Sequence, residues 1–127
     1  MVKIHAKEDC GNAPKKIFVQ DLLVAIVNND ETFISKHTTD DLRWNIAGGA
    51  SVEGKDTVLT ALRQHRSDTL AELTIHTIVT HGYHGVAEGL LKYKDGRQVA
   101  FCDVYQFKAS ANNAPVKAIT TYAVGTE

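Results

Sequence analysis

The stretch that decides the fold is Val99-Ala-Phe-Cys-Asp-Val-Tyr-Gln-Phe107. Side chains on a strand alternate between two faces, so Asp103 shares one face with Phe101 and Tyr105. A carboxylate in an apolar, aromatic row destabilises a fold unless it is protonated or hydrogen-bonded. The row therefore predicts either a solvent-exposed face or a cavity that holds one acid. A cavity of that kind is typical of a small-molecule site.

Length and composition restrict the class of protein. The chain has 127 residues, which fits one domain over residues 1–127, and 43% of them are hydrophobic. Lys and Arg total 14 and Asp and Glu total 15, so the charge balance gives no reason to expect nucleic acid or an anionic membrane as a partner. Cys10 and Cys102 form neither a metal motif nor a disulfide framework. We expect reduced thiols, no metal and no cofactor.

The N-terminal sequence lacks the apolar core of a secretory signal. No apolar stretch approaches the roughly 20 residues that span a bilayer. These features predict a cytoplasmic protein. Residues 1–12 are compatible with a flexible extension or with an extra helix, and the sequence does not decide between the two.

The first half of the chain has helical periodicity. Pro14 is tolerated in a first turn, and the segment 15–28 is apolar nearly all round, which predicts a deeply covered helix. Asp30 is expected to cap a short second helix that carries Phe33, Ile34 and His37. A third helix is predicted over 55–66, with Val58, Leu59 and Leu62 buried.

Strand patterns dominate the second half. A short strand over 42–46 precedes the third helix, and longer strands are predicted over 70–81, 86–94, 98–108 and 115–124. Asp95-Gly96 is the clearest hairpin signal in the chain. Three helices followed by antiparallel strands indicate an α+β fold with the helices on one sheet face.

The second face of the Asp103 strand carries Ala100, Cys102, Val104 and Gln106. This row is small and uncharged, whereas a solvent-facing row normally carries charged side chains. A sheet with two apolar faces needs two covers, and a second subunit is the simplest cover for the face without helices. We therefore expect a homodimer packed through the outer sheet face.

Four stretches resemble the nuclear transport factor 2-like superfamily and, within it, the SnoaL-like (polyketide cyclase and ketosteroid isomerase-like) group. They are Asp41-Leu-Arg-Trp44-Asn-Ile46-Ala-Gly48, Gly54-Lys-Asp-Thr-Val58, the strand Phe101–Phe107, and Ala118-Ile-Thr-Thr-Tyr122. The likeness spans about residues 14 to 124. It implies a cone-shaped fold, in which three N-terminal helices pack on a strongly curved, mixed, mainly antiparallel sheet around an apolar cavity.

The resemblance implies several functions, because that superfamily includes isomerases, dehydratases, cyclases, epoxide hydrolases and binding modules. Asp103 matches the acid that ketosteroid isomerases keep neutral as an oxyanion donor. The rest of that set is missing. Leu22 stands at our best placement of the tyrosine, and Asn45 or Ile46 stands where the carboxylate base belongs. In the polyketide-cyclase branch an aspartate is a general acid/base, so Asp103 is the catalytic candidate, alone or with His81.

Two functions stay open at this point. The first is a pocket protein that binds a small apolar or cyclic molecule, and the second is a cofactor-independent enzyme that uses Asp103 for acid/base proton transfer. For Asp103 the alternative to a site role is a structural carboxylate bonded to Tyr105, Trp44 or Tyr122. His81 and His84 are more typical of a hairpin turn than of a metal site. The expected pocket is lined by Phe18, Leu22, Trp44, Asn45, Phe101, Tyr105 and Tyr122.

Overall fold

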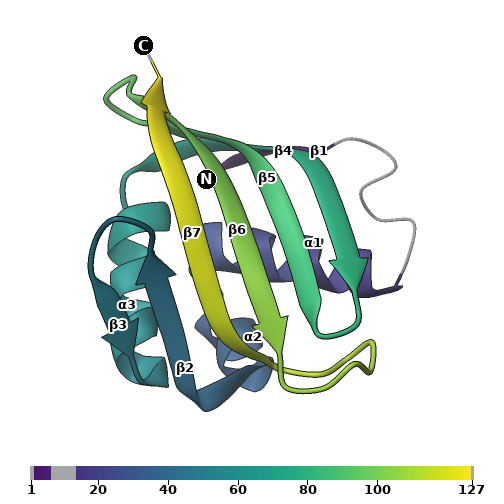
Figure 1. Ribbon diagram of the computed structural model, residues 1–127. Coiled ribbons are helices and arrows are strands. Elements are labelled where there is room, and N and C mark those ends of the chain that lie inside the picture. The colour runs from purple at the N-terminus through teal and green to yellow at the C-terminus, as the bar shows by residue number, and fades with distance from the viewer. Residues whose placement is uncertain (1, 7–13, 127) are drawn as a thin grey trace.

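The computed structural model describes residues 2–6 and 14–126, which form three helices and a curved seven-stranded sheet (Figure 1). The helices are α1 (Pro14–Val27), α2 (Glu31–Lys36) and α3 (Lys55–Arg66). The strands are β1 (Lys3–Ala6), β2 (Thr38–Ile46), β3 (Ser51–Glu53), β4 (Leu70–His81), β5 (His84–Tyr93), β6 (Gln98–Phe107) and β7 (Val116–Thr126). This is the α+β, mixed-sheet architecture that the sequence predicts.

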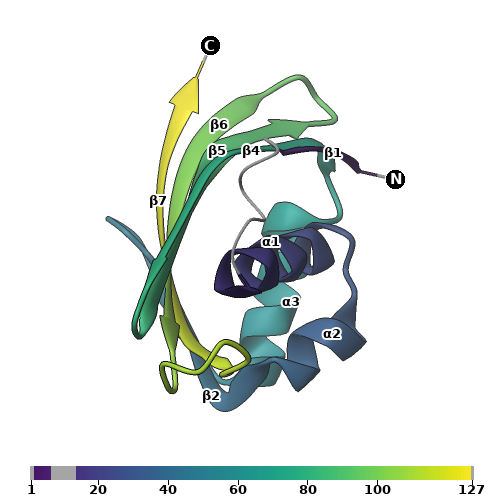
Figure 2. The same cartoon turned by 90° about the vertical axis from the view of Figure 1, so that its right-hand side faces the viewer.

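The sheet order is β1-β4-β5-β6-β7-β2-β3. Strands β4 to β7 form an antiparallel meander, whereas β1 pairs with β4 and β2 pairs with β7 in parallel. Figure 2 shows the long strands bending around α1, so that the sheet is concave towards the helices. The prediction of a strongly curved, mainly antiparallel sheet with helices on one face is confirmed.

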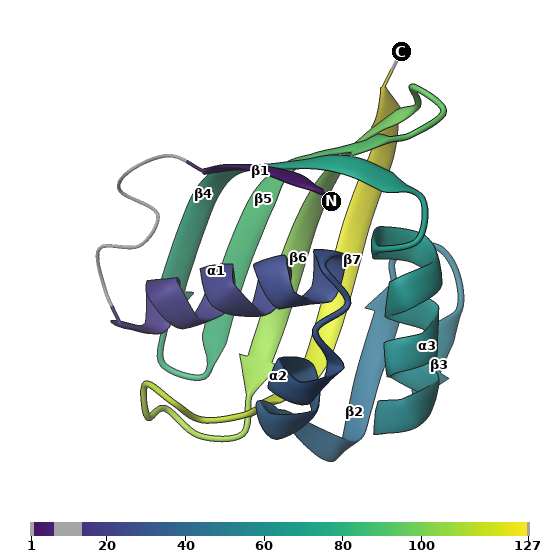
Figure 3. The same ribbon diagram turned by 180° about the vertical axis from the view of Figure 1, so that it is seen from behind.

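Helix α1 crosses the concave face of the sheet (Figure 3). Val19, Leu22, Leu23 and Ile26 are buried, as expected for a helix that is apolar on most sides. The carboxylate of Asp30 accepts a hydrogen bond from the backbone N–H of Phe33 at 3.2 Å, which confirms the predicted cap of α2. The apolar core therefore lies between α1, α3 and the sheet.

The structure contains two strands that the sequence patterns did not reveal, β1 and β3. Both are short edge strands with a single apolar residue in the middle, Ile4 and Val52, so the period-two signal is too short to recognise. β1 shows that residues 3–6 are neither a flexible nor a helical extension, while residues 7–13, Cys10 included, lie outside the described residues. β2 and β5 begin earlier than predicted, and β7 ends two residues later.

Gly89 occupies a position on β5 that no other residue fits. The register of β4 against β5 shifts between Ile75 and Thr77, next to the position paired with Gly89. A Cβ atom on Gly89 would overlap the backbone carbonyl of Thr74, which cannot rotate away. The absence of a side chain therefore permits the close approach of these two strands.

We expect Gly89→Ala to lower the free energy of unfolding by at least about 2 kcal/mol, because the overlap forces a backbone shift. Urea denaturation followed by circular dichroism measures the change. Gly125→Ala is the matched control, since a Cβ there meets nothing within 4 Å. Equal stability changes in the two variants would mean that the overlap does not explain the glycine.

Candidate functional site

The centre of the candidate site is an ion pair in the core. Asp103 on β6 is 0% exposed, and Arg66 at the C-terminal end of α3 is 3% exposed. The Arg66 guanidinium donates from Nη1 to Oδ2 at 2.5 Å and from Nη2 to Oδ1 at 2.8 Å. This bidentate arrangement is a strong, charge-assisted form of hydrogen bonding between a guanidinium and a carboxylate. The Asp103 carboxylate therefore has its counter-charge within the fold.

Three further side chains complete what we call the buried network, defined as Asp103, Arg66, Tyr105, Thr121 and Trp44. The Tyr105 hydroxyl donates to Oδ2 at 2.9 Å and the Thr121 hydroxyl donates to Oδ1 at 2.7 Å. The Trp44 indole N–H donates to the Thr121 oxygen at 2.8 Å. Four hydrogen bonds thus reach the two carboxylate oxygens, two of them from Arg66.

The surroundings of the buried network set the protonation states of Arg66 and Tyr105. Burial would lower the pKa of the Arg66 guanidinium, but the charge and hydrogen bonds of Asp103 together raise that pKa above its ordinary value. Burial, followed by the charge of Asp103, raises the pKa of the Tyr105 phenol well above its ordinary value. Tyr105 is therefore a neutral donor at physiological pH, and Arg66 is a permanent cation.

Arg66 is the site residue that sequence reasoning missed. It ends a polar stretch, Arg63-Gln-His-Arg66, which reads as a solvated helix end. However, Val58, Leu62 and Arg66 are spaced by four residues and share one face of α3, and all three are buried. That spacing was the available signal. Thr121 was also missed, although it pairs directly with Asp103 in the β6–β7 register.

Three of the predicted pocket residues lie with Asp103 on the concave side of the sheet. Trp44, Phe101 and Tyr105 are 2%, 3% and 0% exposed. The Arg66 guanidinium lies 5.1 Å from the centre of the Phe101 ring and 5.9 Å from that of Trp44. Aromatic rings therefore surround the cation as well as the carboxylate.

The two predicted pocket residues on α1 lie on the concave side but outside the buried network. Leu22 is fully buried in the core. Phe18 is half-buried, and its ring centre lies 5.2 Å from that of His37 and 6.0 Å from that of Phe107. Phe18 thus stands at the margin of the core.

Asn45 and Tyr122 lie on the opposite, convex face of the sheet. Asn45 pairs with Thr120 and donates to its hydroxyl at 3.4 Å, and Tyr122 pairs with Cys102 and is 53% exposed. The structure does not bring them together with Asp103. His81, the second catalytic candidate, is exposed beside the β4–β5 turn.

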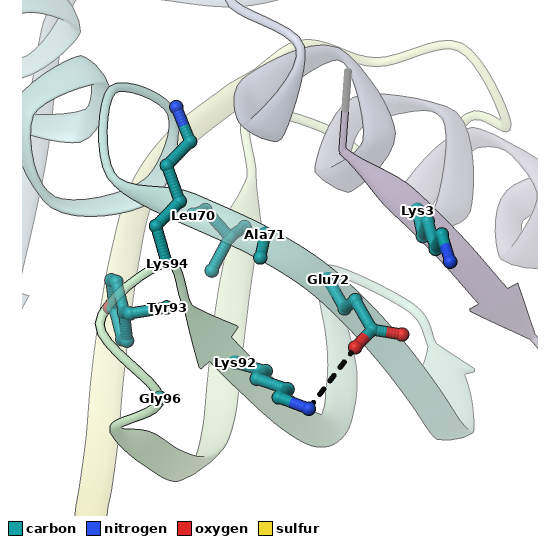
Figure 4. Close-up of a pocket in the computed structure, with 8 residues that line it drawn as sticks. All are labelled: Lys3, Leu70, Ala71, Glu72, Lys92, Tyr93, Lys94 and Gly96. Atoms are coloured by element: carbon teal, nitrogen blue, oxygen red, sulfur yellow. Dashed lines mark ion pairs between the residues drawn. The ribbon is translucent and has the colours of Figure 1, made fainter.

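A hollow of about 400 Å³ opens at the β1–β4–β5 edge of the sheet (Figure 4). It is lined by Lys3, Leu70, Ala71, Glu72, Lys92, Tyr93, Lys94 and Gly96. Its central charges are paired already, because Glu72 lies 3.6 Å from Lys92 and 3.0 Å from His5. The Lys94 amine points away from Glu72 and Lys3, and it donates to the carbonyl of Asp68 at 3.2 Å. This hollow contains none of the predicted site residues.

Three other hollows also lie away from the buried network. One of about 450 Å³ separates Val52 from α3, one of about 540 Å³ adjoins Val27, Ser67 and Leu70, and one of about 400 Å³ lies at the start of α3. Within residues 2–6 and 14–126, His, Cys, Asp and Glu do not form a group of three that could hold a metal ion. In the same part of the chain, each helix is too short or too polar to cross a bilayer.

Comparison with solved structures places this architecture in a known class, the α+β proteins whose curved sheet wraps a long first helix. An NTF-2 like protein of unknown function from Burkholderia xenovorans LB400 matches with a TM-score of 0.74 and 16% identity, over 90% of this chain and 85% of the other. A protein described as a ketosteroid isomerase from Kribbella flavida DSM 17836 matches with a TM-score of 0.73 and 10% identity, over 90% and 80% of the two chains.

A protein described as a SnoaL-like polyketide cyclase from Shewanella denitrificans OS-217 matches with a TM-score of 0.70 and 12% identity, over 87% of this chain and 90% of the other. No family model and no curated protein matches the sequence. This chain has the nuclear transport factor 2-like fold, and the resemblance read from its motifs is confirmed at that level.

We expect Asp103→Leu and Arg66→Met each to lower the free energy of unfolding by about 3–5 kcal/mol, because each leaves one charge or its donors buried without a partner. The double variant Arg66→Met/Asp103→Leu should lose less than the sum of its single changes. Urea denaturation of the four proteins, wild type included, measures the coupling.

Glu53→Gln is the control, because the Arg43–Glu53 pair is solvent-exposed at 4.0 Å and should contribute less than about 1 kcal/mol. Strictly additive losses in the double variant would contradict the structural role of the ion pair.

Proposed function

We propose that this protein is a binding module for a small apolar molecule and that Asp103 holds the fold together instead of transferring protons. The observation that carries this proposal is the occupation of both carboxylate oxygens by donors from Arg66, Tyr105 and Thr121. A general base needs a free lone pair within reach of the substrate proton. Asp103 would have to release these donors first.

The character of the concave side supports an apolar ligand. Among residues 2–6 and 14–126, the one buried acid is Asp103, which Arg66 neutralises, and most of the other buried side chains are aromatic or aliphatic. The half-buried rings of Phe18 and Phe33, with His37 between them, form an aromatic margin to the core. Apolar and aromatic walls with few polar groups are typical of small-molecule sites.

The competing function is an enzyme that uses Asp103 as an acid/base. Some proteins with the same fold are described as a ketosteroid isomerase and as a polyketide cyclase, which supports testing carbonyl substrates. Fold alone does not transfer activity. Under this alternative, a ligand would need to displace Arg66 or Tyr105 from the carboxylate.

We expect saturable binding of the neutral fluorescent dye N-phenyl-1-naphthylamine and no turnover of an unconjugated ketosteroid or a β-diketone. Fluorescence titration measures the binding, and absorbance assays at matched enzyme concentration measure the turnover. Phe18→Ala should weaken dye binding by about tenfold through lost aromatic contact. Exposed Tyr83→Ala is the control for a change of aromatic residue outside the core.

Turnover that Asp103→Asn abolishes in a folded protein would favour the enzyme. Absence of dye binding would refute the binding module.

We also propose that two copies of the chain pack through the outer apolar face. We define this face as Val79, Val86, Leu90, Ala100, Cys102, Val104, Tyr122 and Val124. Cross-strand pairing puts these residues on one side of the sheet, for example Val79 with Val86, Val86 with Val104, and Cys102 with Tyr122. Val79, Tyr122 and Val124 are 53%, 53% and 69% exposed. Apolar surface gathered in this way is typical of an interface.

The charged side chains on this side of the sheet have partners within the chain. Glu88 lies within this face, because it pairs with Cys102 on β6, and its carboxylate lies 3.6 Å from the His76 ring. Lys92 lies 3.6 Å from Glu72, so both carboxylates on this side of the sheet have a basic neighbour. Two sheets can then pack face to face with little charge repulsion.

We expect sedimentation equilibrium at micromolar concentration to give twice the mass of one chain. Tyr122→Lys should weaken association by at least tenfold, because it buries a charge in the interface. Ile17→Lys is the matched control, since Ile17 is 45% exposed on α1 and lies off this face. A wild-type mass equal to one chain would refute the dimer.

A further inference from the structure

Lys15 is a second buried charge, and its environment differs from that of Asp103 and Arg66. Its side chain, in the first turn of α1, is only 6% exposed. The ammonium donates to the carbonyl of Gly82 at 2.9 Å and to the carbonyl of Ser110 at 3.1 Å. It also lies 4.3 Å from the centre of the Phe107 ring. All three of these partners are neutral.

The described residues give Lys15 no counter-charge. Within residues 2–6 and 14–126, the ion pairs on the concave side join Arg66 to Asp103 and leave Lys15 without a carboxylate. The buried charged residues in this part of the chain are Lys15, Arg66 and Asp103, so one positive charge is left over. Burial lowers the pKa of the Lys15 ammonium, as expected for a cation with neutral neighbours.

Apolar side chains adjoin this cation. Val19 and Phe107 close tightly around Gly85, since a Cβ there would lie 3.1 Å and 3.2 Å from their side chains. Phe18 adjoins Phe107 on the same side, with ring centres 6.0 Å apart. Figure 3 shows the start of α1, the β4–β5 turn and the β6–β7 loop meeting at this end of the fold. A desolvated cation beside aromatic rings suits a ligand with an anionic end and an apolar body.

We propose that Lys15 recognises the carboxylate of a small amphipathic acid whose apolar part packs against the half-buried ring of Phe18. This inference rests on the proposed function and names the chemical class of its ligand. The carboxylate would supply the counter-charge that the described residues lack, and it would make a charge-assisted hydrogen bond with the ammonium.

Of the two hydrogen bonds that the Lys15 ammonium donates, the one to Ser110 is the one that a ligand would replace. Gly82 lies in a tight two-residue turn between β4 and β5, so its carbonyl is held in place. Ser110 lies in the exposed loop between β6 and β7 and makes the longer of the two hydrogen bonds. The carboxylate would take the place of the Ser110 carbonyl, and Gly82 would continue to orient the ammonium.

The test compares octanoate with 1-octanol, which share an apolar chain and differ in charge. We expect octanoate to bind the full-length protein at least about tenfold more tightly in isothermal titration calorimetry, as for a hydrogen bond to a charged group. Lys15→Met should remove this preference, and Lys15→Arg should keep most of it. Lys16→Met is the matched control, because it removes the same charge from the adjacent position of α1 and should leave the preference intact.

A second measurement does not depend on any variant. In a ¹³C NMR titration of Lys15 Cε, we expect a pKa below that of an ordinary lysine without ligand and a higher pKa with octanoate. A raised pKa in the free protein would overturn the proposal, because the chain would then already supply a counter-charge.

The outcomes separate this inference from the proposed function. Equal affinity for octanoate and 1-octanol, or an unchanged preference in folded Lys15→Met, refutes recognition by Lys15 but leaves the binding module standing. Absence of binding by both compounds and by the neutral dye refutes both.

Discussion

The ion pair between Arg66 and Asp103 is the constraint on which the rest of the structure depends. It joins the end of α3 to the middle of β6, and through Thr121 and Trp44 it extends to β7 and β2. Neither charge is tolerated alone in this core, because desolvation of an unpaired ion destabilises a fold by several kcal/mol. The pair therefore fixes the position of the C-terminal end of α3 relative to β6.

The same ion pair determines the chemical environment of Asp103 on the concave side of the sheet. The carboxylate of Asp103 is not a lone acid among aromatic residues, because a guanidinium and two hydroxyls donate to it. The chain shares its curved sheet and long first helix with a protein described as a ketosteroid isomerase, and in this chain the Arg66 guanidinium donates to the Asp103 carboxylate. At the start of α1, Lys15 is a buried cation without a counter-charge among the described residues.

Much of the fold followed from local patterns. The continuous apolar surface of α1, the cap at Asp30 and the Asp95-Gly96 turn each act over a few residues, and each is found as predicted. The sequence patterns did not predict the edge strands β1 and β3, because each is only three or four residues long and is defined by backbone pairing to a neighbouring strand. The site was predicted only in part: Trp44, Phe101 and Tyr105 do gather around Asp103, while Asn45 and Tyr122 face the other way.

The sequence by itself determined that Asp103 lies in an apolar, aromatic row, because the two-residue alternation of a strand is a local property. Only the tertiary structure decided which groups that acid contacts. Its principal partner, Arg66, lies 37 positions away and reaches it because α3 packs against β2 and β3 with Val58, Leu62 and Arg66 buried on one face. A strand pattern shows that a carboxylate needs a partner, but the identity of that partner depends on how distant elements pack, and here that packing places a cation beside the acid.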